Sequence, residues 1–245
     1  MSDINFNIIK EENIPDVKIL VAGFPGPGLI GGIASEQLIN SLEMEQVASL
    51  ECDQFPPTAV VFDGIPRRPV RFFYGKGFLL VKSDIVIPSE LTIPLADKIV
   101  DWCLKRGVED IIIFDGIPKR EEKERTKVWG VLSSHAAESE AEKLNVEIIK
   151  KGAISGISSS LILRAHEKHL KAVGMFAEGN QNIPDPRAAA TLLDKFANYK
   201  GLEINTHSLV ESAEKLEEQY SKLVEKTKET QESIEKRSAH PPLYG

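Results

Sequence analysis

The first residues whose types and spacing could do chemistry are three glycines, Gly26, Gly28 and Gly31, within the segment VKILVAGFPGPGLIGG. They fit the pattern G-x-G-x-x-G, in which a tight turn lets the backbone approach a dinucleotide while amides at a helix N-terminus hold its pyrophosphate. Glu51 follows Gly31 by 20 residues, at the end of the second apolar run. A carboxylate at this distance binds the ribose in such sites. One hypothesis is therefore a Rossmann-like nucleotide-binding enzyme.

Two prolines in the same loop argue against that hypothesis. Pro25 and Pro27 have no backbone N–H, so a loop that would bind phosphate through its amides lacks two donors. In the alternative interpretation, the glycines let the loop turn and let the next helix pack closely on the sheet, while the prolines stiffen the loop. A loop that serves a protein interface fits the same letters. We favour these two alternatives over a nucleotide site.

The rest of the chain has none of the common catalytic motifs: no G-x-S-x-G, no G-x-x-x-x-G-K-[ST] and no H-E-x-x-H. Cys52 and Cys103 lack metal-like spacing, and His166 and His169 lack a nearby third ligand. The loop Gly152 to Gly156 is a second place where a small ligand could bind, because its small residues leave amides open beside a helix start. We expect no catalytic residue, metal or cofactor, and hence a protein that is not an enzyme.

The elements around the glycines predict an α/β fold. The apolar run Val17 to Ala22 predicts a buried strand, and a helix is expected from Leu29. Asp110 to Phe114 is apolar throughout its IIIF run, as in a central parallel strand. Val70 to Tyr74 and Phe78 to Lys82 flank a glycine turn and predict a β-hairpin. Further strands are expected at 47–50, 59–62, 128–132, 146–150 and 170–177, and helices at 90–106, 133–144, 158–168 and 186–199. The fold class is thus three-layer α/β, with a mostly parallel Rossmann-like sheet flanked by helices.

Two segments of this chain share almost every letter. Phe62 to Arg68 reads FDGIPRR and Phe114 to Arg120 reads FDGIPKR, and each directly follows an apolar strand. Because an Asp before a Gly commonly makes a turn through its own side chain, the simpler interpretation is two matching turns. In the alternative, both loops emerge at the same sheet edge as the Gly23 loop and form one face with it.

Composition limits the class of protein. A chain of 245 residues, 42% of them hydrophobic, can bury one substantial core, or one core and an appendage. No apolar run approaches the roughly 20 residues of a membrane span, and the N-terminus lacks a basic segment followed by an apolar one. Two cysteines make no disulfide framework, and a net charge of -7 argues against nucleic-acid binding. We expect a cytoplasmic protein that binds neither membranes nor nucleic acid.

The sequence changes character at Thr206. Apolar and small residues then recur at alternating steps of four and three, which is typical of a helix that buries a narrow seam. They are Leu209, Ala213, Leu216, Tyr220, Leu223 and Thr227. The parent domain or a neighbouring subunit's helix must cover this seam. Glu225 to Lys236 is nearly all polar, so the distal helix is expected to project into solvent. We predict an α/β domain at 1–205, a projecting helix at 206–238 and a flexible tail at 239–245.

The sequence resembles the archaeal homologues of the proteasome assembly chaperones. The resemblance covers most of the chain and rests on the GFPGPGLIGG loop, the FDGIP segments, the GAISGISSSL segment, and a long helix with a terminal hydrophobic-Tyr-any residue motif. It implies an ATP-independent assembly chaperone or activator whose tails dock on the α ring of the 20S proteasome. Leu243 is then the hydrophobic member, Tyr244 the tyrosine and Gly245 the carboxylate donor. The resemblance also implies a homo-oligomer, expected to be a tetramer. A structural oligomer with an inert tail remains the third hypothesis.

Overall fold

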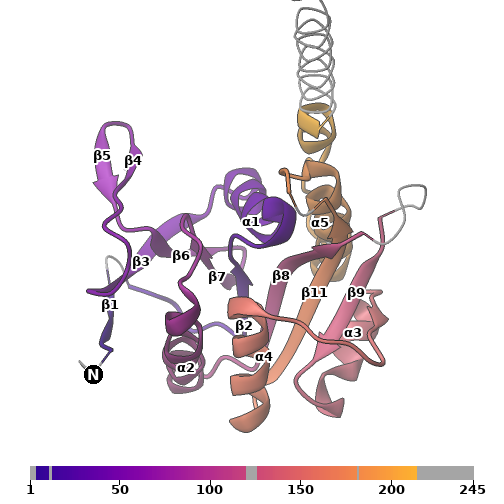
Figure 1. Cartoon of the computed structure of the whole chain (residues 1–245), viewed down its shortest axis with the longest axis horizontal. Coiled ribbons are helices and arrows are strands. Elements are labelled where there is room, and N and C mark those ends of the chain that lie inside the picture. Colours follow the sequence, from indigo (N-terminus) through magenta and orange to yellow (C-terminus); the bar gives the residue numbers. More distant parts are fainter. Residues whose placement is uncertain (1–3, 11–12, 120–125, 181, 214–245) are drawn as a thin grey trace, which may run out of the picture.

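The computed structural model describes residues 4–10, 13–119, 126–180 and 182–213 (Figure 1). A nine-stranded sheet carries helices on both faces, and a separate two-stranded hairpin projects from one side. This arrangement confirms the predicted α/β class. The strands of the large sheet are β1 (Phe6–Lys10), β2 (Ile19–Gly23), β3 (Glu45–Cys52), β6 (Val70–Gly75), β7 (Phe78–Ser83), β8 (Asp110–Pro118), β9 (Val128–Leu132), β10 (Glu147–Ile148) and β11 (Lys171–Gly179); β4 (Val60–Phe62) and β5 (Ile65–Arg67) form the hairpin. The helices are α1 (Ile30–Ser41), α2 (Ser89–Lys105), α3 (Glu138–Lys143), α4 (Gly156–Glu167) and α5 (Pro186–Lys200), with short 3-10 helices at Pro27–Leu29 and His135–Ala137.

The large sheet is mixed, in the order β1-β3-β6-β7-β2-β8-β11-β9-β10. Parallel pairing joins its four central strands, β7, β2, β8 and β11, and also joins β9 to β10. The remaining pairs are antiparallel, including the predicted hairpin of β6 and β7. Strand β2 therefore lies deep in the sheet, with the glycine loop at its carboxyl end. In an open α/β sheet, this is the edge at which ligands usually bind.

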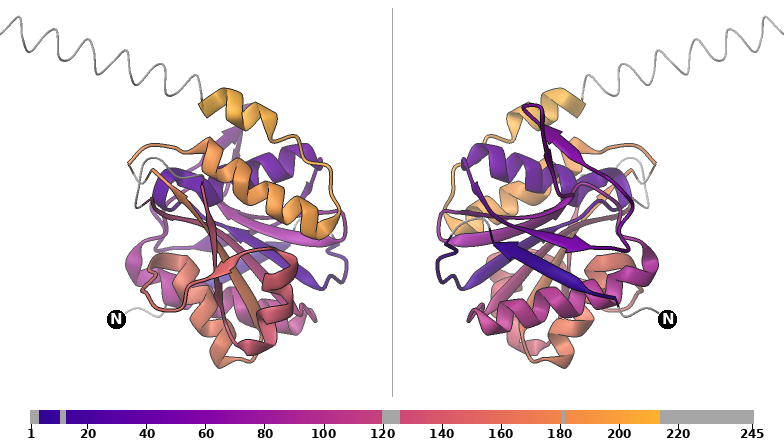
Figure 2. Two further views of the ribbon diagram at one scale, coloured as in Figure 1. Left: turned by 90° about the vertical axis from the view of Figure 1, so that its right-hand side faces the viewer. Right: turned by 90° about the vertical axis from the view of Figure 1, so that its left-hand side faces the viewer.

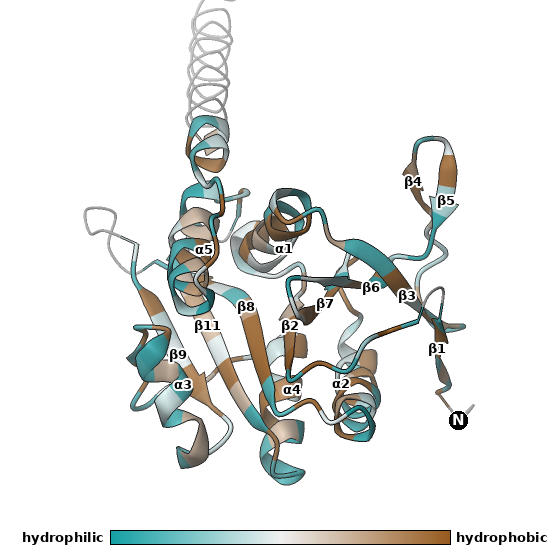
Figure 3. Cartoon of the chain, turned by 180° about the vertical axis from the view of Figure 1, so that it is seen from behind, coloured by the Kyte–Doolittle hydropathy of each residue, from teal (hydrophilic) through white to brown (hydrophobic). Residues whose placement is uncertain are grey.

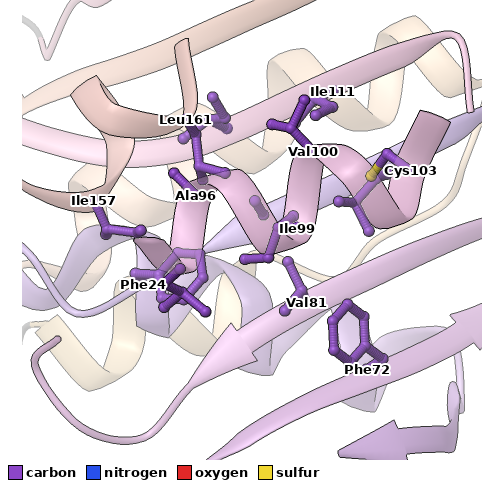
Figure 4. Close-up of a cluster of buried hydrophobic side chains, with 14 of the residues drawn as sticks. Phe24, Phe72, Val81, Ala96, Ile99, Val100, Cys103, Ile111, Ile157 and Leu161 are labelled. Atoms are coloured by element: carbon purple, nitrogen blue, oxygen red, sulfur yellow. The ribbon is translucent and has the colours of Figure 1, made fainter. Parts of the chain in front are cut away.

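Helices cover both faces of the sheet (Figure 2). Helices α2 and α4 pack on one face, where Ile99, Val100 and Leu161 are fully buried (Figure 4). Helices α1 and α5 pack on the other face around Phe196, with α3 beside them. Asp185 caps α5 as its sequence predicts, since its Oδ1 accepts a hydrogen bond of 3.0 Å from the Ala188 amide. The sheet therefore lies between two apolar cores, one on each face.

Three expectations differ from the structure. The expected turn at Phe114 to Arg120 is wrong for its first part, because β8 continues to Pro118 in register with β11. The expected strand at 59–62 forms, but as part of the separate hairpin. The expected helix at 133–144 begins later, because Ser133 stays outside it. Its hydroxyl accepts a hydrogen bond from the Ala172 amide and donates one to the Leu170 carbonyl.

Candidate functional site

The glycine loop between β2 and α1 is packed against the chain's own backbone. A Cβ atom on Gly28 would lie 2.4 Å from the Asn180 carbonyl oxygen, and one on Gly31 would lie 2.3 Å from the Phe114 carbonyl oxygen. Gly28 also has a φ of +62°, which favours glycine. Gly28 lets the loop turn close to Asn180, and Gly31 lets the start of α1 approach β8. The geometry therefore supports the interpretation in which the glycines serve turning and close packing.

The first glycine of the pattern faces a carboxylate. A Cβ atom on Gly26 would lie 2.2 Å from Oδ1 of Asp115, a side chain on β8 that is only 7% exposed. The same oxygen accepts a hydrogen bond of 2.8 Å from the Gly116 amide. A dinucleotide would place its pyrophosphate over such a loop, so the buried carboxylate occupies space and carries charge of the same sign as the phosphates. This contact weakens the nucleotide hypothesis further.

Burial raises the pKa of Asp115 from 3.8 to about 6, although the nearby Ser158 hydroxyl and the Gly116 amide oppose the rise. At neutral pH the group is therefore mostly ionised. Sequence reasoning did not select this residue, since its Asp-Gly pair was interpreted as a turn. The buried IIIF run before it was the one available signal that the strand could continue.

The structure does not bring Glu51 to the glycine loop. Glu51 lies on β3, and two strands, β6 and β7, separate β3 from β2. Three strand spacings correspond to roughly 14 Å. Its Oε1 instead accepts a hydrogen bond of 2.9 Å from Arg68. The predicted ribose-binding role of Glu51 is therefore wrong, because the chain returns from α1 to a distant antiparallel strand rather than to a neighbour of β2.

The second glycine-containing loop meets the first at the same sheet edge. It leads into α4, which begins at Gly156 with a φ of +81°. Ile157 and Phe24 belong to one buried cluster (Figure 4), and Ser158 lies near Asp115. Two loops that the sequence separates by more than 120 residues thus form one packed edge. Small side chains here let the loops and helix starts pack closely.

The start of the C-terminal helix packs on the face of the sheet opposite α2. Helical residues run from His207 to Ala213, and Leu209 and Ala213 are buried, at 8% and 3% exposure. Gln37 of α1 donates a hydrogen bond of 2.7 Å to the Asn205 carbonyl. Thr206 Oγ1 donates one of 2.9 Å to Asp194 of α5. The parent domain therefore covers the first part of the predicted seam, and residues 207–213 lie beside α1 and α5 (Figure 1).

The terminal residues Leu243, Tyr244 and Gly245, together with Leu216 and Leu223 of the seam, lie outside the described residues.

Within the described ranges, no group of three or more His, Cys, Asp or Glu side chains is arranged to hold a metal ion. In the same part of the chain, no helix combines the length and apolar character needed to cross a membrane. Burial strongly raises the pKa of the Cys103 thiol, which makes it a poor nucleophile.

Comparisons with known proteins give a consistent result. The family model described as the PAC2 family matches residues 20–224. An uncharacterised protein of Methanocaldococcus jannaschii is 31% identical over 207 residues, which cover 84% of this chain and 85% of that protein.

Two solved structures from Pyrococcus furiosus are similar to this chain over most of its length. PbaA, described as an archaeal homologue of proteasome-assembly chaperone, is 30% identical and has a TM-score of 0.83, covering 95% of this chain and 97% of that chain. PbaB, described as an archaeal proteasome activator, is 25% identical and has a TM-score of 0.81, covering 89% and 98%.

Proposed function

The chain belongs to the PAC2 family, and from this premise we propose that it is a proteasome assembly chaperone or activator. In this proposal it is not an enzyme and needs no ATP, and it binds the α ring of the 20S proteasome in the cytoplasm. Its similarity to PbaA and PbaB over nearly the whole chain is the observation that carries the proposal. The packing of the glycine loop on Asp115 also favours a binding protein over a nucleotide enzyme.

The proposed contact residues are Leu243, Tyr244 and Gly245. A terminal carboxylate suits a pocket lined by cations or amides, and the adjacent side chains give specificity. The tyrosine ring offers a large contact area with few rotors, and its hydroxyl finds a polar partner. Complete burial of the leucine is worth on the order of 1.5 to 3 kcal/mol. The tripeptide therefore offers a binding pocket an apolar side chain, an aromatic ring and a carboxylate.

One tail by itself is expected to bind weakly. Ordering a chain terminus and losing rigid-body freedom consume much of the contact energy. Several tails on one homo-oligomer raise the effective concentration of each next contact. We therefore propose a homotetramer with its tails on one side. The hydrogen bonds of Gln37 and Thr206 support this proposal, because they hold the start of the C-terminal helix, residues 207–213, on its domain.

Removing the terminal residues tests the proposal. Deletion of Leu243 to Gly245, or Tyr244→Ala, should abolish binding to purified proteasome α rings in a pull-down or surface-binding assay. Adding residues after Gly245 should have the same effect because it moves the carboxylate. The matched control carries the same added residues before Met1 and should bind as the unmodified protein does. Undiminished binding by a Tyr244→Ala protein of normal oligomeric state would disprove the docking mechanism.

A direct ligand measurement tests the rival enzyme hypothesis. Isothermal titration calorimetry with ATP, ADP and NAD should detect no micromolar binding, because Asp115 faces the loop that would hold the phosphates. Micromolar binding of any of the three would favour the Rossmann-like alternative.

A further inference from the structure

Strand β1 is the last strand of the large sheet at the end away from β10 (Figures 1 and 3). It pairs with β3 on one side, and the view onto this end of the sheet shows no described helix or strand in front of it (Figure 2, right). In the described chain, no backbone hydrogen bond outside the β1–β3 ladder involves residues 6–10. Such a strand edge presents unpaired N–H and C=O groups, with which an extended peptide can pair.

A pocket of about 420 Å³ lies between this strand and α2. Strand β1 contributes Ile8 and Lys10 to it, and α2 contributes Lys98, Asp101, Trp102 and Lys105. Ile8 packs on the core beneath α2, and Lys10 faces the same side because it is two residues further along the strand. The four α2 residues lie three or four apart, so they share one face of the helix. The strand and the helix thus form two walls of one pocket.

The pocket carries positive charge. Three lysines line it, and none of them has an ion pair among the described residues; they are Lys10, Lys98 and Lys105. Asp101 is the acidic member of the lining, and its Oδ1 accepts a hydrogen bond of 2.7 Å from Lys168 of α4. The charge of Asp101 is therefore balanced from outside the pocket. Three unpaired amines favour a ligand that carries negative charge.

Trp102 gives the pocket a fixed apolar wall. Its ring centre lies 4.8 Å from that of Phe72, and the Arg106 guanidinium lies 5.2 Å from the centre of the indole ring. Trp102 and Ile8 are both half-buried, so part of each stays accessible from the pocket. An acidic side chain with methylene groups suits this lining, because its methylenes can pack on the apolar walls while its carboxylate reaches a lysine.

We propose that β1 and this pocket bind an extended acidic peptide. The peptide adds a strand to the outer edge of β1, and its alternate side chains, about 7 Å apart, point into the pocket. Glutamates at these positions meet Lys10, Lys98 and Lys105, and their methylenes contact Trp102. This site adds a peptide-binding surface to the chain, and it does not rest on the proposed binding of the proteasome.

A charge-reversal experiment tests the pocket. The probe is a fluorescein-labelled decapeptide in which Glu alternates with Thr, and fluorescence anisotropy measures its affinity. The full-length protein should bind this peptide more tightly than a peptide with Gln in place of Glu, and added NaCl should weaken the binding. Lys98→Glu with Lys105→Glu should weaken it about tenfold or more. Equal affinity for the Glu and Gln peptides would overturn the charge recognition.

A matched double variant controls for the change in net charge. Lys150 and Lys151 are both exposed, and they follow β10 at the other end of the sheet. Lys150→Glu with Lys151→Glu should bind the peptide as the wild type does. Circular dichroism and Tm should match the wild type for both double variants. If the two double variants lose affinity equally, the pocket is not the binding site.

Backbone methylation tests the added strand. Two further peptides carry N-methyl groups on every glutamate or on every threonine. Since successive N–H groups of a strand point to opposite edges, only one of these sets can pair with β1. One peptide should therefore lose binding, and the other should keep it and slow hydrogen exchange at residues 6–10. Equal binding of the two peptides, or unchanged exchange at residues 6–10, would overturn the strand addition.

A nucleic-acid probe tests the class of ligand. A labelled oligouridylate with the same net charge as the Glu peptide should bind more weakly, because it has no peptide N–H and C=O groups to pair with β1. Binding of this RNA as tight as that of the peptide would overturn the assignment of a peptide ligand.

Discussion

Two segments with nearly the same sequence have opposite structures in this protein. Phe62-Asp63-Gly64-Ile65-Pro66 makes an exposed hairpin, whereas Phe114-Asp115-Gly116-Ile117-Pro118 continues a buried central strand. The first has no strand of the large sheet beside it, and its Asp and Gly adopt positive φ. The second lies between β11 and the glycine loop. The difference teaches that local turn preference decides only where no neighbouring strand offers hydrogen bonds and burial.

The largest expected difference between the two segments is in how much their phenylalanines contribute to the free energy of unfolding. Phe114 is fully buried and its ring centre lies 5.2 Å from that of Phe196, whereas Phe62 is 42% exposed. Phe114→Ala should lower the free energy of unfolding by about 4 kcal/mol, and Phe62→Ala by about 1 kcal/mol. Denaturant unfolding followed by circular dichroism measures both. Equal losses would contradict the assignment of one segment to the core and the other to the surface.

The two glycines should show a smaller difference in the stability cost of replacement by alanine. A Cβ atom on Gly116 would lie 2.4 Å from the Pro27 carbonyl oxygen, whereas one on Gly64 meets no atom within 4 Å. Gly116→Ala should therefore cost about 3 kcal/mol, because a backbone carbonyl must move. Gly64→Ala should cost about 1 kcal/mol through its positive φ alone. The same unfolding measurement checks them, and a Gly116→Ala protein as stable as the wild type would show that the loop at Pro27 is not closely packed.

The two aspartates should differ in a way that depends on pH. Burial raises the pKa of Asp115 from 3.8 to about 6, so the native state binds its proton more tightly than the unfolded state between these values. The free energy of unfolding should therefore fall as pH rises from about 4 to about 6, and level off above. Two pKa units correspond to roughly 2 to 3 kcal/mol.

Asp115→Asn should remove this decline and leave the variant more stable than the wild type at pH 7. Unfolding curves at pH 4, 5, 6 and 7 measure the difference, with Asp63→Asn on the exposed turn as the matched control. A decline of the same size in the Asp115→Asn protein would mean that another group titrates.

Much of the fold could be predicted from sequence, for identifiable reasons. The run Asp110 to Phe114 is apolar at every position that a two-sided burial requires, and the structure places it at the centre of the sheet. Asp185 before Pro186 is a strong helix start, and it caps α5. The hairpin of β6 and β7 followed from its glycine turn. In each case the signal lies within a few residues.

The candidate sites were less predictable. The glycine pattern was located correctly, but its one proposed partner in ribose binding was not within reach. Glu51 lies three strand spacings away, because strand order is a property of the whole chain rather than of a spacing in sequence. Asp115, which does face the loop, looked like a turn residue. The proposed docking residues Leu243 to Gly245 lie outside the described residues and stay a prediction.

The sequence by itself determined the class of the fold, the main strands and helices, the family resemblance and the motif at the terminus. Those depend on local composition, periodicity and short motifs. Only the tertiary structure decided that one FDGIP segment is buried and the other exposed, and that Gly26 packs on a carboxylate. The physical reason is that burial and charge proximity arise from pairing between distant segments, and identical letters carry no record of which neighbours they will meet.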